Sequence, residues 1–95
     1  FDSGTTTVAT SGTEQQLSNT TNRVRWIKAK ALAANSGIAY LGVSDISTTN
    51  GYELSAGNEV EINFADIGGT VAFSSFYVDV ASNGDKVSWM VVLDG

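Results

Sequence analysis

The apolar residues of this chain follow the period of a β-strand. In the segment 59–64, Val60, Ile62 and Phe64 alternate with two glutamates and an asparagine, which is the pattern of a strand buried on one face. No window repeats its apolar residues every ~3.6 positions, as a helix would require. β-Branched and aromatic residues, which favour strands, are spread over the whole chain. These patterns predict strands and argue against a helical fold.

Short runs of this kind predict strands at residues 5–10, 24–32, 38–43, 52–54, 59–64, 71–80 and 86–93. Residues 29–34 favour a helix by composition, but so short a helix is marginal in isolation, and we predict that they continue the strand. Asn83-Gly84 lies between the last two runs and is a strong hairpin signal, so we expect these runs to pair directly. Strands at this spacing, with no helices between them, predict a small antiparallel β-sandwich, jelly-roll or Ig-like, or a partly open barrel.

A chain of 95 residues is long enough for one domain. We predict a single sandwich domain over residues 14–95. Residues 2–13 offer just Val8 and Ala9 for burial, so residues 1–13 form either an N-terminal arm or an edge strand. The predicted core residues are Leu17, Ile27, Leu41, Leu54, Val60, Ile62, Phe64, Val78, Val80, Val91 and Leu93.

One predicted strand changes its alternation midway. Val24 and Trp26 occupy even positions, whereas Ile27, Ala29 and Ala31 occupy odd ones. Either a β-bulge between Trp26 and Ile27 switches the faces, or a neighbouring subunit covers part of one face. The sequence leaves both interpretations open.

The same strand holds four of the five basic residues, although the whole chain has a net charge of −5. Arg23, Arg25, Lys28 and Lys30, together with Trp26, are therefore the predicted protein-interface residues, because a basic strand suits an acidic partner or a second copy. The negative charge disfavours nucleic-acid binding. The longest apolar stretches, at 71–73 and 89–93, are too short to span a membrane.

Residue chemistry argues against catalysis. The chain contains no histidine and no cysteine, which excludes an imidazole base and a thiolate nucleophile. Glu59 and Glu61 share a strand face, but that face is the one predicted to meet solvent. Asp66 beside Gly68-Gly69, and the segment 83–85, could supply oxygen ligands to calcium, yet both lack the ligand spacing of a calcium loop and are better explained as turns. We expect no enzymatic activity, no cofactor and no metal.

Five aromatic residues could form a platform for sugars: Trp26, Trp89, Tyr40, Tyr52 and Tyr77. Aromatic residues at strand spacing more often belong to a core or an interface. Tyr52, beside Gly51, is the one expected to be exposed and to face a ligand.

Several short motifs follow one another in a recognisable order. They are Gln15-Gln16-Leu17, Val24-Arg25-Trp26-Ile27-Lys28-Ala29, Asn35-Ser36-Gly37-Ile38-Ala39-Tyr40-Leu41-Gly42-Val43-Ser44, Gly51-Tyr52-Glu53-Leu54-Ser55-Ala56-Gly57-Asn58-Glu59-Val60-Glu61-Ile62 and Tyr77-Val78-Asp79-Val80-Ala81-Ser82-Asn83-Gly84-Asp85-Lys86-Val87. In this order the chain resembles a class of small β-sandwich virion proteins of tailed bacteriophages. These motifs are turn and strand signatures without a catalytic fingerprint. Two segments are unusual for the class, the alanine-rich residues 29–34 and the extra residues 73–76.

The resemblance implies a structural role in a virion. Proteins of this class serve as head decoration (cementing) proteins or as modules of tail and fibre proteins. The resemblance does not fix the location on the virion. We predict the capsid exterior, with the major capsid protein and further copies of this chain as partners, in a homotrimer. A tail-associated or carbohydrate-binding adhesive module is the alternative.

Overall fold

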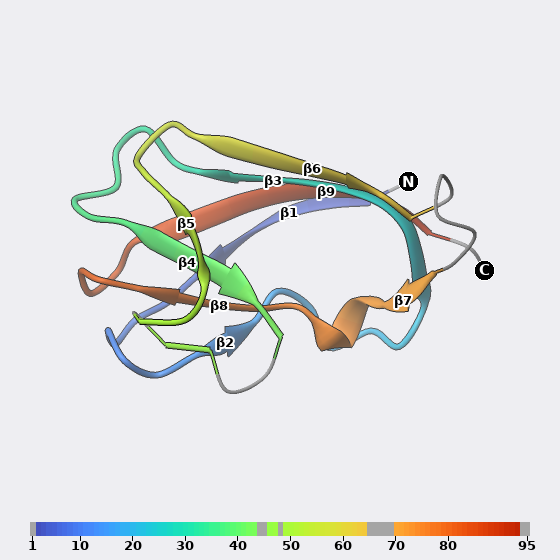
Figure 1. Cartoon of the computed structure of the whole chain (residues 1–95), viewed down its shortest axis with the longest axis horizontal. Coiled ribbons are helices and arrows are strands. Elements are labelled where there is room, and N and C mark those ends of the chain that lie inside the picture. The colour runs from blue at the N-terminus through green and yellow to red at the C-terminus, as the bar shows by residue number, and fades with distance from the viewer. Residues whose placement is uncertain (1, 44–45, 48, 65–69, 94–95) are drawn as a thin grey trace.

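Two antiparallel β-sheets pack face to face in this protein (Figure 1). The computed structural model describes residues 2–43, 46–47, 49–64 and 70–93. The five-stranded sheet contains, in order, β1 (Asp2–Thr7), β9 (Lys86–Leu93), β3 (Arg23–Ala31) and β6 (Glu59–Asn63), and β7 (Val71–Ala72) also pairs with β3. The four-stranded sheet contains, in order, β2 (Gln15–Gln16), β8 (Tyr77–Val80), β4 (Ala39–Gly42) and β5 (Tyr52–Leu54). The predicted all-β antiparallel sandwich is confirmed.

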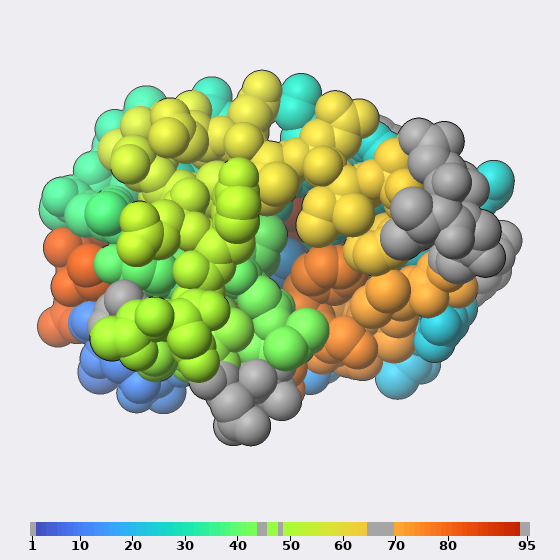
Figure 2. All heavy atoms as spheres, in the orientation of Figure 1, coloured from blue at the N-terminus to red at the C-terminus, as the bar shows by residue number. Residues whose placement is uncertain are grey.

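The two sheets do not close into a barrel. β6 and β5 are the last strands of their sheets on one side, and Figure 2 shows a hollow there, between the yellow atoms of β6 and the green atoms of β4 and β5. On β6, Val60 and Ile62 are half-buried, and Glu59 and Glu61 are exposed. The alternation predicted for this strand is confirmed, and the open side explains why its apolar face is only partly covered.

The core lies between the sheets and includes most of the predicted residues. Seven of the eleven are buried: Leu17, Ile27, Leu41, Leu54, Val78, Val80 and Val91. Val60, Ile62, Phe64 and Leu93 pack against this core but are only partly buried. The prediction missed Val8, Val24, Ala29, Ala31, Ala39, Phe73, Phe76 and Val87. Val8, Phe73 and Phe76 lie outside the strands, where strand periodicity gives no signal. Three others are alanines, whose hydrophobicity is weak.

Trp89 shows how the sequence fills the five-stranded sheet's inner face. Its cross-strand neighbours are Gly4 on β1 and Ala29 on β3, so the largest side chain lies between two of the smallest. A Cβ atom on Gly4 would lie 2.6 Å from Cζ2 of Trp89. The indole packs edge-on against Phe73, with 4.9 Å between ring centroids, and its Nε1 donates a hydrogen bond to Thr6 Oγ1 at 3.0 Å. Small neighbours thus leave room for one large ring, which is the complementarity a close-packed core requires.

The change of alternation in β3 is a β-bulge, at a position one residue earlier than predicted. Val24 pairs with Leu93 and Trp26 pairs with Val92, so Arg25 has no partner of its own on β9. The extra residue lets both Val24 and Ile27 face the core, where each is almost fully buried. Trp26, between them, faces outward. The prediction of a bulge is confirmed, but placing it between Trp26 and Ile27 was wrong.

The predicted hairpin around Asn83-Gly84 is wrong. The turn exists, because Gly84 has a φ of 83° and Asp85 N donates to Ser82 O. However, β8 belongs to the four-stranded sheet and β9 to the five-stranded sheet, so the turn connects the two layers. The backbone of this turn pairs with Val8, whose N donates to Asp85 O and whose O accepts from Gly84 N. An Asn-Gly turn satisfies its own local geometry, whereas the partners of the flanking strands depend on contacts distant in sequence.

Three predicted strand boundaries also differ from the structure. Residues 71–80 do not form one strand. They form β7, a 3-10 turn at Phe73–Ser75 and then β8, because the chain crosses here from one sheet to the other. The strand predicted at residues 5–10 is β1, Asp2–Thr7, which lies at the edge of the five-stranded sheet. In the predicted strand 24–32, β3 ends at Ala31, and the alanines that follow do not continue it.

Candidate interaction surface

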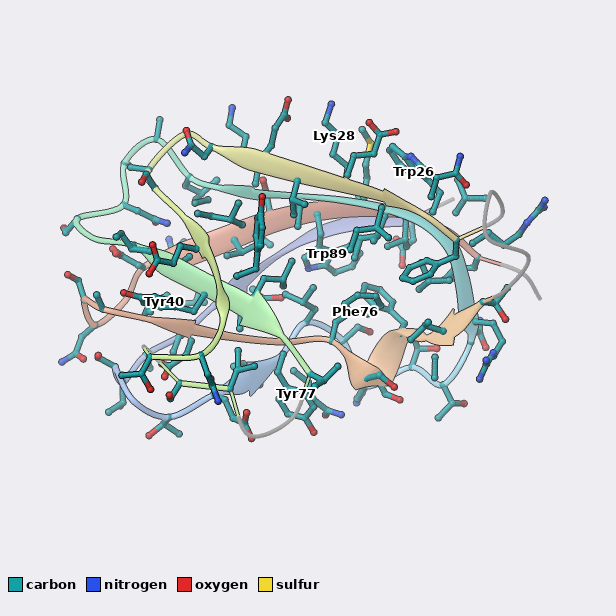
Figure 3. The ribbon with its side chains drawn as sticks, viewed as in Figure 1. Trp26, Lys28, Tyr40, Phe76, Tyr77 and Trp89 are labelled. Carbon is teal, nitrogen blue, oxygen red and sulfur yellow. The ribbon has the colours of Figure 1, made fainter. Side chains whose placement is uncertain are left out.

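Four strands of the five-stranded sheet present a continuous row of side chains to the outside. Since Ile27, Ala29 and Ala31 face the core, the alternate residues of β3 face outward. The cross-strand register extends this face to the neighbouring strands. This outer face consists of Trp26, Lys28 and Lys30 on β3, Ser88, Met90 and Val92 on β9, Ser3 and Thr5 on β1, and Glu59, Glu61 and Asn63 on β6. In Figure 3, Trp26 and Lys28 point away from the sandwich, whereas Trp89 points between the sheets.

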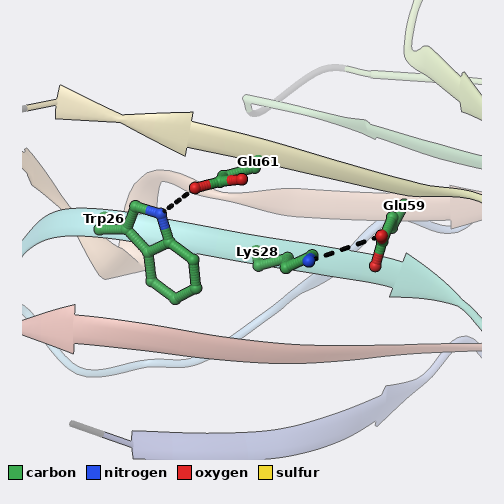
Figure 4. Close-up of polar contacts among 4 residues, drawn as sticks. All are labelled: Trp26, Lys28, Glu59 and Glu61. Atoms are coloured by element: carbon green, nitrogen blue, oxygen red, sulfur yellow. Dashed lines mark hydrogen bonds and ion pairs between the residues drawn. The ribbon is translucent and has the colours of Figure 1, made fainter.

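Trp26 is held in place at one end of this face, next to the bulge. Its indole Nε1 donates a hydrogen bond of 2.6 Å to Glu61 Oε2 on β6. In Figure 4 the indole is seen face-on over β3, so its flat surface is turned toward solvent. A hydrogen bond to a carboxylate is among the stronger ones in proteins, and it restricts the rotation of this side chain. The face therefore carries an aromatic ring whose orientation is already set.

Lys28 makes an ion pair across the same two strands. Its Nζ lies 3.5 Å from Glu59 Oε1, and the two side chains are 33% and 52% exposed. Exposed ion pairs of this kind contribute only ~0–1 kcal/mol to stability. The pair does mean that part of the predicted basic charge is balanced within the molecule.

The other three predicted interface residues differ in their surroundings. The guanidinium of Arg23 is already hydrogen-bonded within the molecule. Its Nε donates to Thr70 Oγ1 at 3.0 Å, and its Nη2 donates to Thr70 O at 2.7 Å. Arg25 lies at the bulge, and Lys30 lies on the outer face. Both are exposed, and neither side chain makes an ion pair or hydrogen bond to any residue in the described segments. The structure therefore places Arg25 beside Trp26 and Lys28 beside Lys30, whereas the guanidinium of Arg23 is engaged with Thr70.

Two shallow depressions mark the outer face. The first has a volume of about 440 Å³ and is lined by Ser3, Gly4, Thr5, Lys28, Lys30, Glu59, Ser88, Trp89 and Met90. The second, of about 500 Å³, is lined by Arg25, Trp26, Asn63 and Val92. Lys28 and Trp26 are alternate residues of one strand, so the depressions lie side by side. Together they combine apolar, hydroxyl and basic groups, a combination that suits the binding of a partner better than the catalysis of a reaction.

Tyr52 is exposed, as predicted, with 61% of its surface accessible. It lies on β5, in the other sheet from Trp26. Tyr40 is buried, and Tyr77 and Trp89 are half-buried. The five aromatic residues therefore do not form one platform.

Three of the described carboxylates make contacts within the fold. Glu59 and Glu61 face solvent, as predicted, where they contact Lys28 and Trp26. Asp85 is buried, and its carboxylate accepts hydrogen bonds from Ser36 N at 3.0 Å and Gly37 N at 2.9 Å. Asp66 and Gly68-Gly69 lie outside the described residues. Within the described ranges, no group of three or more acidic side chains is arranged to hold a metal ion.

Sequence reasoning missed Asp79. It is fully buried on β8, and its Oδ1 accepts hydrogen bonds from Gly12 N at 2.9 Å and Val80 N at 2.8 Å. The partner Gly12 lies far away in the sequence, so no local motif indicates this contact. The residue secures the loop before β2 to the four-stranded sheet.

In the part of the chain that the structure describes, no helix is long and apolar enough to cross a membrane. No protein-family model matches the chain, and no curated protein or solved structure matches it.

Proposed function

We propose that this chain is a non-enzymatic structural protein of a tailed-phage virion. It decorates the exterior of the head by binding the major capsid protein and stabilises contacts between capsomers. The resemblance of the turn and strand motifs supports the virion role. The main structural support for binding as the mode of action is the outer face of the five-stranded sheet. On this face a hydrogen bond to Glu61 already orients Trp26.

Three residues on or beside this face are of types that are enriched at protein interfaces. Tryptophan and arginine are the residues that most often dominate binding energy, and methionine is also enriched at interfaces. Trp26, Arg25 and Met90 supply these groups on adjacent strands. Because Trp26 is restricted before binding, less side-chain entropy is lost when a partner covers it.

The charges on the face favour an acidic partner. Arg25 and Lys30 are exposed without an ion pair inside the described residues, although the chain as a whole carries a net charge of −5. A local basic patch on an acidic protein orients it on a partner with the opposite pattern. Nucleic acid and membranes are not partners in this proposal, because the overall negative charge opposes both phosphate backbones and anionic lipid surfaces.

The test is binding to undecorated phage shells, measured by co-sedimentation. Trp26→Ala and Lys30→Glu should each weaken binding at least about tenfold, a typical effect for truncating an interface anchor. Tyr52→Ala is the matched control, because it removes an exposed aromatic residue from the other sheet. Circular dichroism establishes that every variant is folded. Unchanged binding by both outer-face variants would contradict the proposed surface, and no binding by the wild-type chain would contradict the proposed function.

A carbohydrate-binding adhesive module is the second candidate, and the orientation of Trp26 favours it specifically. A flat indole turned toward solvent can stack on the apolar face of a sugar ring, and Asn63 and Arg25 line the depression beside it with hydrogen-bond donors. A glycan array separates the two functions. Strong binding that disappears in Trp26→Ala and persists in Tyr52→Ala would support the adhesive function, whereas shell binding without glycan binding would support decoration.

A further inference from the structure

β1 is a long, unprotected edge of the five-stranded sheet. It occupies the end of the strand order and contains six residues, Asp2–Thr7, none of which is Pro, Lys or Arg. The other edges differ. β2 has two residues, β5 has three, and β6 carries Glu59 and Glu61. Proteins usually shorten or charge such edges, because their unpaired backbone groups can bind another strand.

The hydrogen-bond pattern shows which backbone groups of β1 are free. Val8 N donates to Asp85 O, and Val8 O accepts from Gly84 N, so the backbone of Val8 faces the β9 side. Backbone groups alternate in direction along a strand, so those of Gly4 and Thr6 also face β9. The N–H and C=O groups of Ser3, Thr5 and Thr7 must then point to the open edge.

Ser3 confirms this direction. Its backbone N donates a hydrogen bond to Asp2 Oδ1 at 2.8 Å and so finds its partner in a neighbouring side chain. Among the described residues, no backbone group other than those of β9 pairs with the backbone of β1. At this edge Thr5 and Thr7 therefore each offer a backbone donor and acceptor, and Ser3 offers its backbone C=O.

We propose that this edge binds the β1 edge of a second copy of the chain, in antiparallel orientation about a two-fold axis at Thr5. This register places Thr5 opposite Thr5 of the second copy, and Ser3 opposite Thr7. The three open-edge residues of each strand are then paired, and Ser3 N exchanges its hydrogen bond to Asp2 Oδ1 for one to the second copy. Hydroxyl side chains face one another, a favourable cross-strand arrangement. The single charge, Asp2, has no like charge opposite it, because Val8 is the residue in register with it.

The two-fold arrangement has a consequence for the outer face. A two-fold axis normal to the sheet joins the two five-stranded sheets into one and leaves both outer faces on the same side. Ser3 and Thr5 line the first depression, so the depressions of the two copies meet across the junction. Two binding faces on one side of a dimer can engage a repetitive surface together, which raises their apparent affinity. The trimer that the resemblance implies would not use this symmetric contact.

The first test is the mass in solution, measured by sedimentation equilibrium at chain concentrations up to about 1 mM, where weak dimers are populated. The expected species is a dimer. A chain that stays monomeric over this range would overturn the proposal, and so would a trimer. Because this measurement involves no shells or glycans, its outcome is independent of the proposed function.

The second test is a charge exchange at the paired positions. Ser3→Lys with Thr7→Lys places like charges opposite each other at both ends of the junction and should raise the dimer Kd at least about tenfold. Ser3→Glu with Thr7→Glu should do the same. An equimolar mixture of the two double variants should form a heterodimer, because each Lys then faces a Glu.

The control is Glu53→Lys, which changes the charge of an exposed residue on β5 and should leave the dimer unaffected. Circular dichroism checks that each double variant is folded. A mixture that stays monomeric, or double variants that dimerise as well as wild type, would exclude this register. Dimerisation lost equally in Glu53→Lys would exclude the β1 edge.

Discussion

Replacing Gly4 by alanine should destabilise the protein, although alanine usually stabilises a strand relative to glycine. The general gain is roughly 0.5–1 kcal/mol, because glycine loses more backbone entropy on folding. At this position the added Cβ would lie 2.6 Å from Cζ2 and 3.0 Å from Cη2 of Trp89. The ring cannot move freely, since Phe73 contacts it and Thr6 Oγ1 accepts its hydrogen bond.

The magnitude follows from these contacts. Overpacking of a core typically costs about 1–3 kcal/mol, and displacing the indole would also weaken a hydrogen bond with a net contribution of about 1 kcal/mol. After the entropic gain is subtracted, Gly4→Ala should lower the free energy of unfolding by about 1–3 kcal/mol. For a domain of this size, each kcal/mol corresponds to a Tm shift of about 4–8 °C.

A double-mutant cycle tests the cause. Trp89→Phe removes the ring atoms that the new methyl group would meet, so Gly4→Ala should cost at least about 1 kcal/mol less in that background. Urea denaturation followed by far-UV circular dichroism measures all four proteins, at low concentration so that self-association does not contribute. Ser3→Ala, on the opposite face of β1, is the control and should change stability by less than about 0.5 kcal/mol. If the two substitutions prove additive, the steric argument fails.

Three further predictions concern the layers and the outer face. Asp85→Ala should lower the free energy of unfolding by about 2–4 kcal/mol in urea denaturation, because two part-buried N–H groups lose a charged acceptor that is itself buried. A loss under 1 kcal/mol would contradict this. Gly84→Ala should cost about 1–2 kcal/mol, since φ is 83°, and Gly84→Asn, measured in the same assay, should cost less. Lys28→Ala should change stability by under about 0.5 kcal/mol at any salt concentration, and a larger, salt-dependent loss would show that its pair with Glu59 matters.

Much of the fold could be predicted because its signals are local. The alternation of Val60 and Ile62 with two glutamates marks a half-buried strand regardless of its partners. The odd positions of Ile27 and Ala29, after the even Val24, likewise require a change of face. Neither pattern says which residue is extra. The bulge lies at Arg25 because Val24 and Trp26 must pair with consecutive residues of β9, and that is a long-range condition.

The candidate surface could be predicted only in part. Trp26, Lys28 and Lys30 share a face because they alternate along one strand, and this is visible in the sequence. Their partners are not, since Glu61 and Glu59 come from a strand some 30 positions away in the chain. The directions of the two tryptophan side chains also depend on residues of other strands. Trp89 faces the core because Gly4 and Ala29 leave space beside it, and nothing local to Trp89 indicates that.

The sequence by itself determined the class of structure, because strand periodicity and turn residues act over a few neighbouring positions. It determined that the chain turns at Asn83-Gly84, since glycine accepts the positive φ found there. Only the tertiary structure decided that this turn crosses between sheets, because β8 pairs with β4 while β9 pairs with β1 and β3. Pairing depends on which distant strands bury the most apolar surface together, and that energy is a property of the whole chain rather than of any segment.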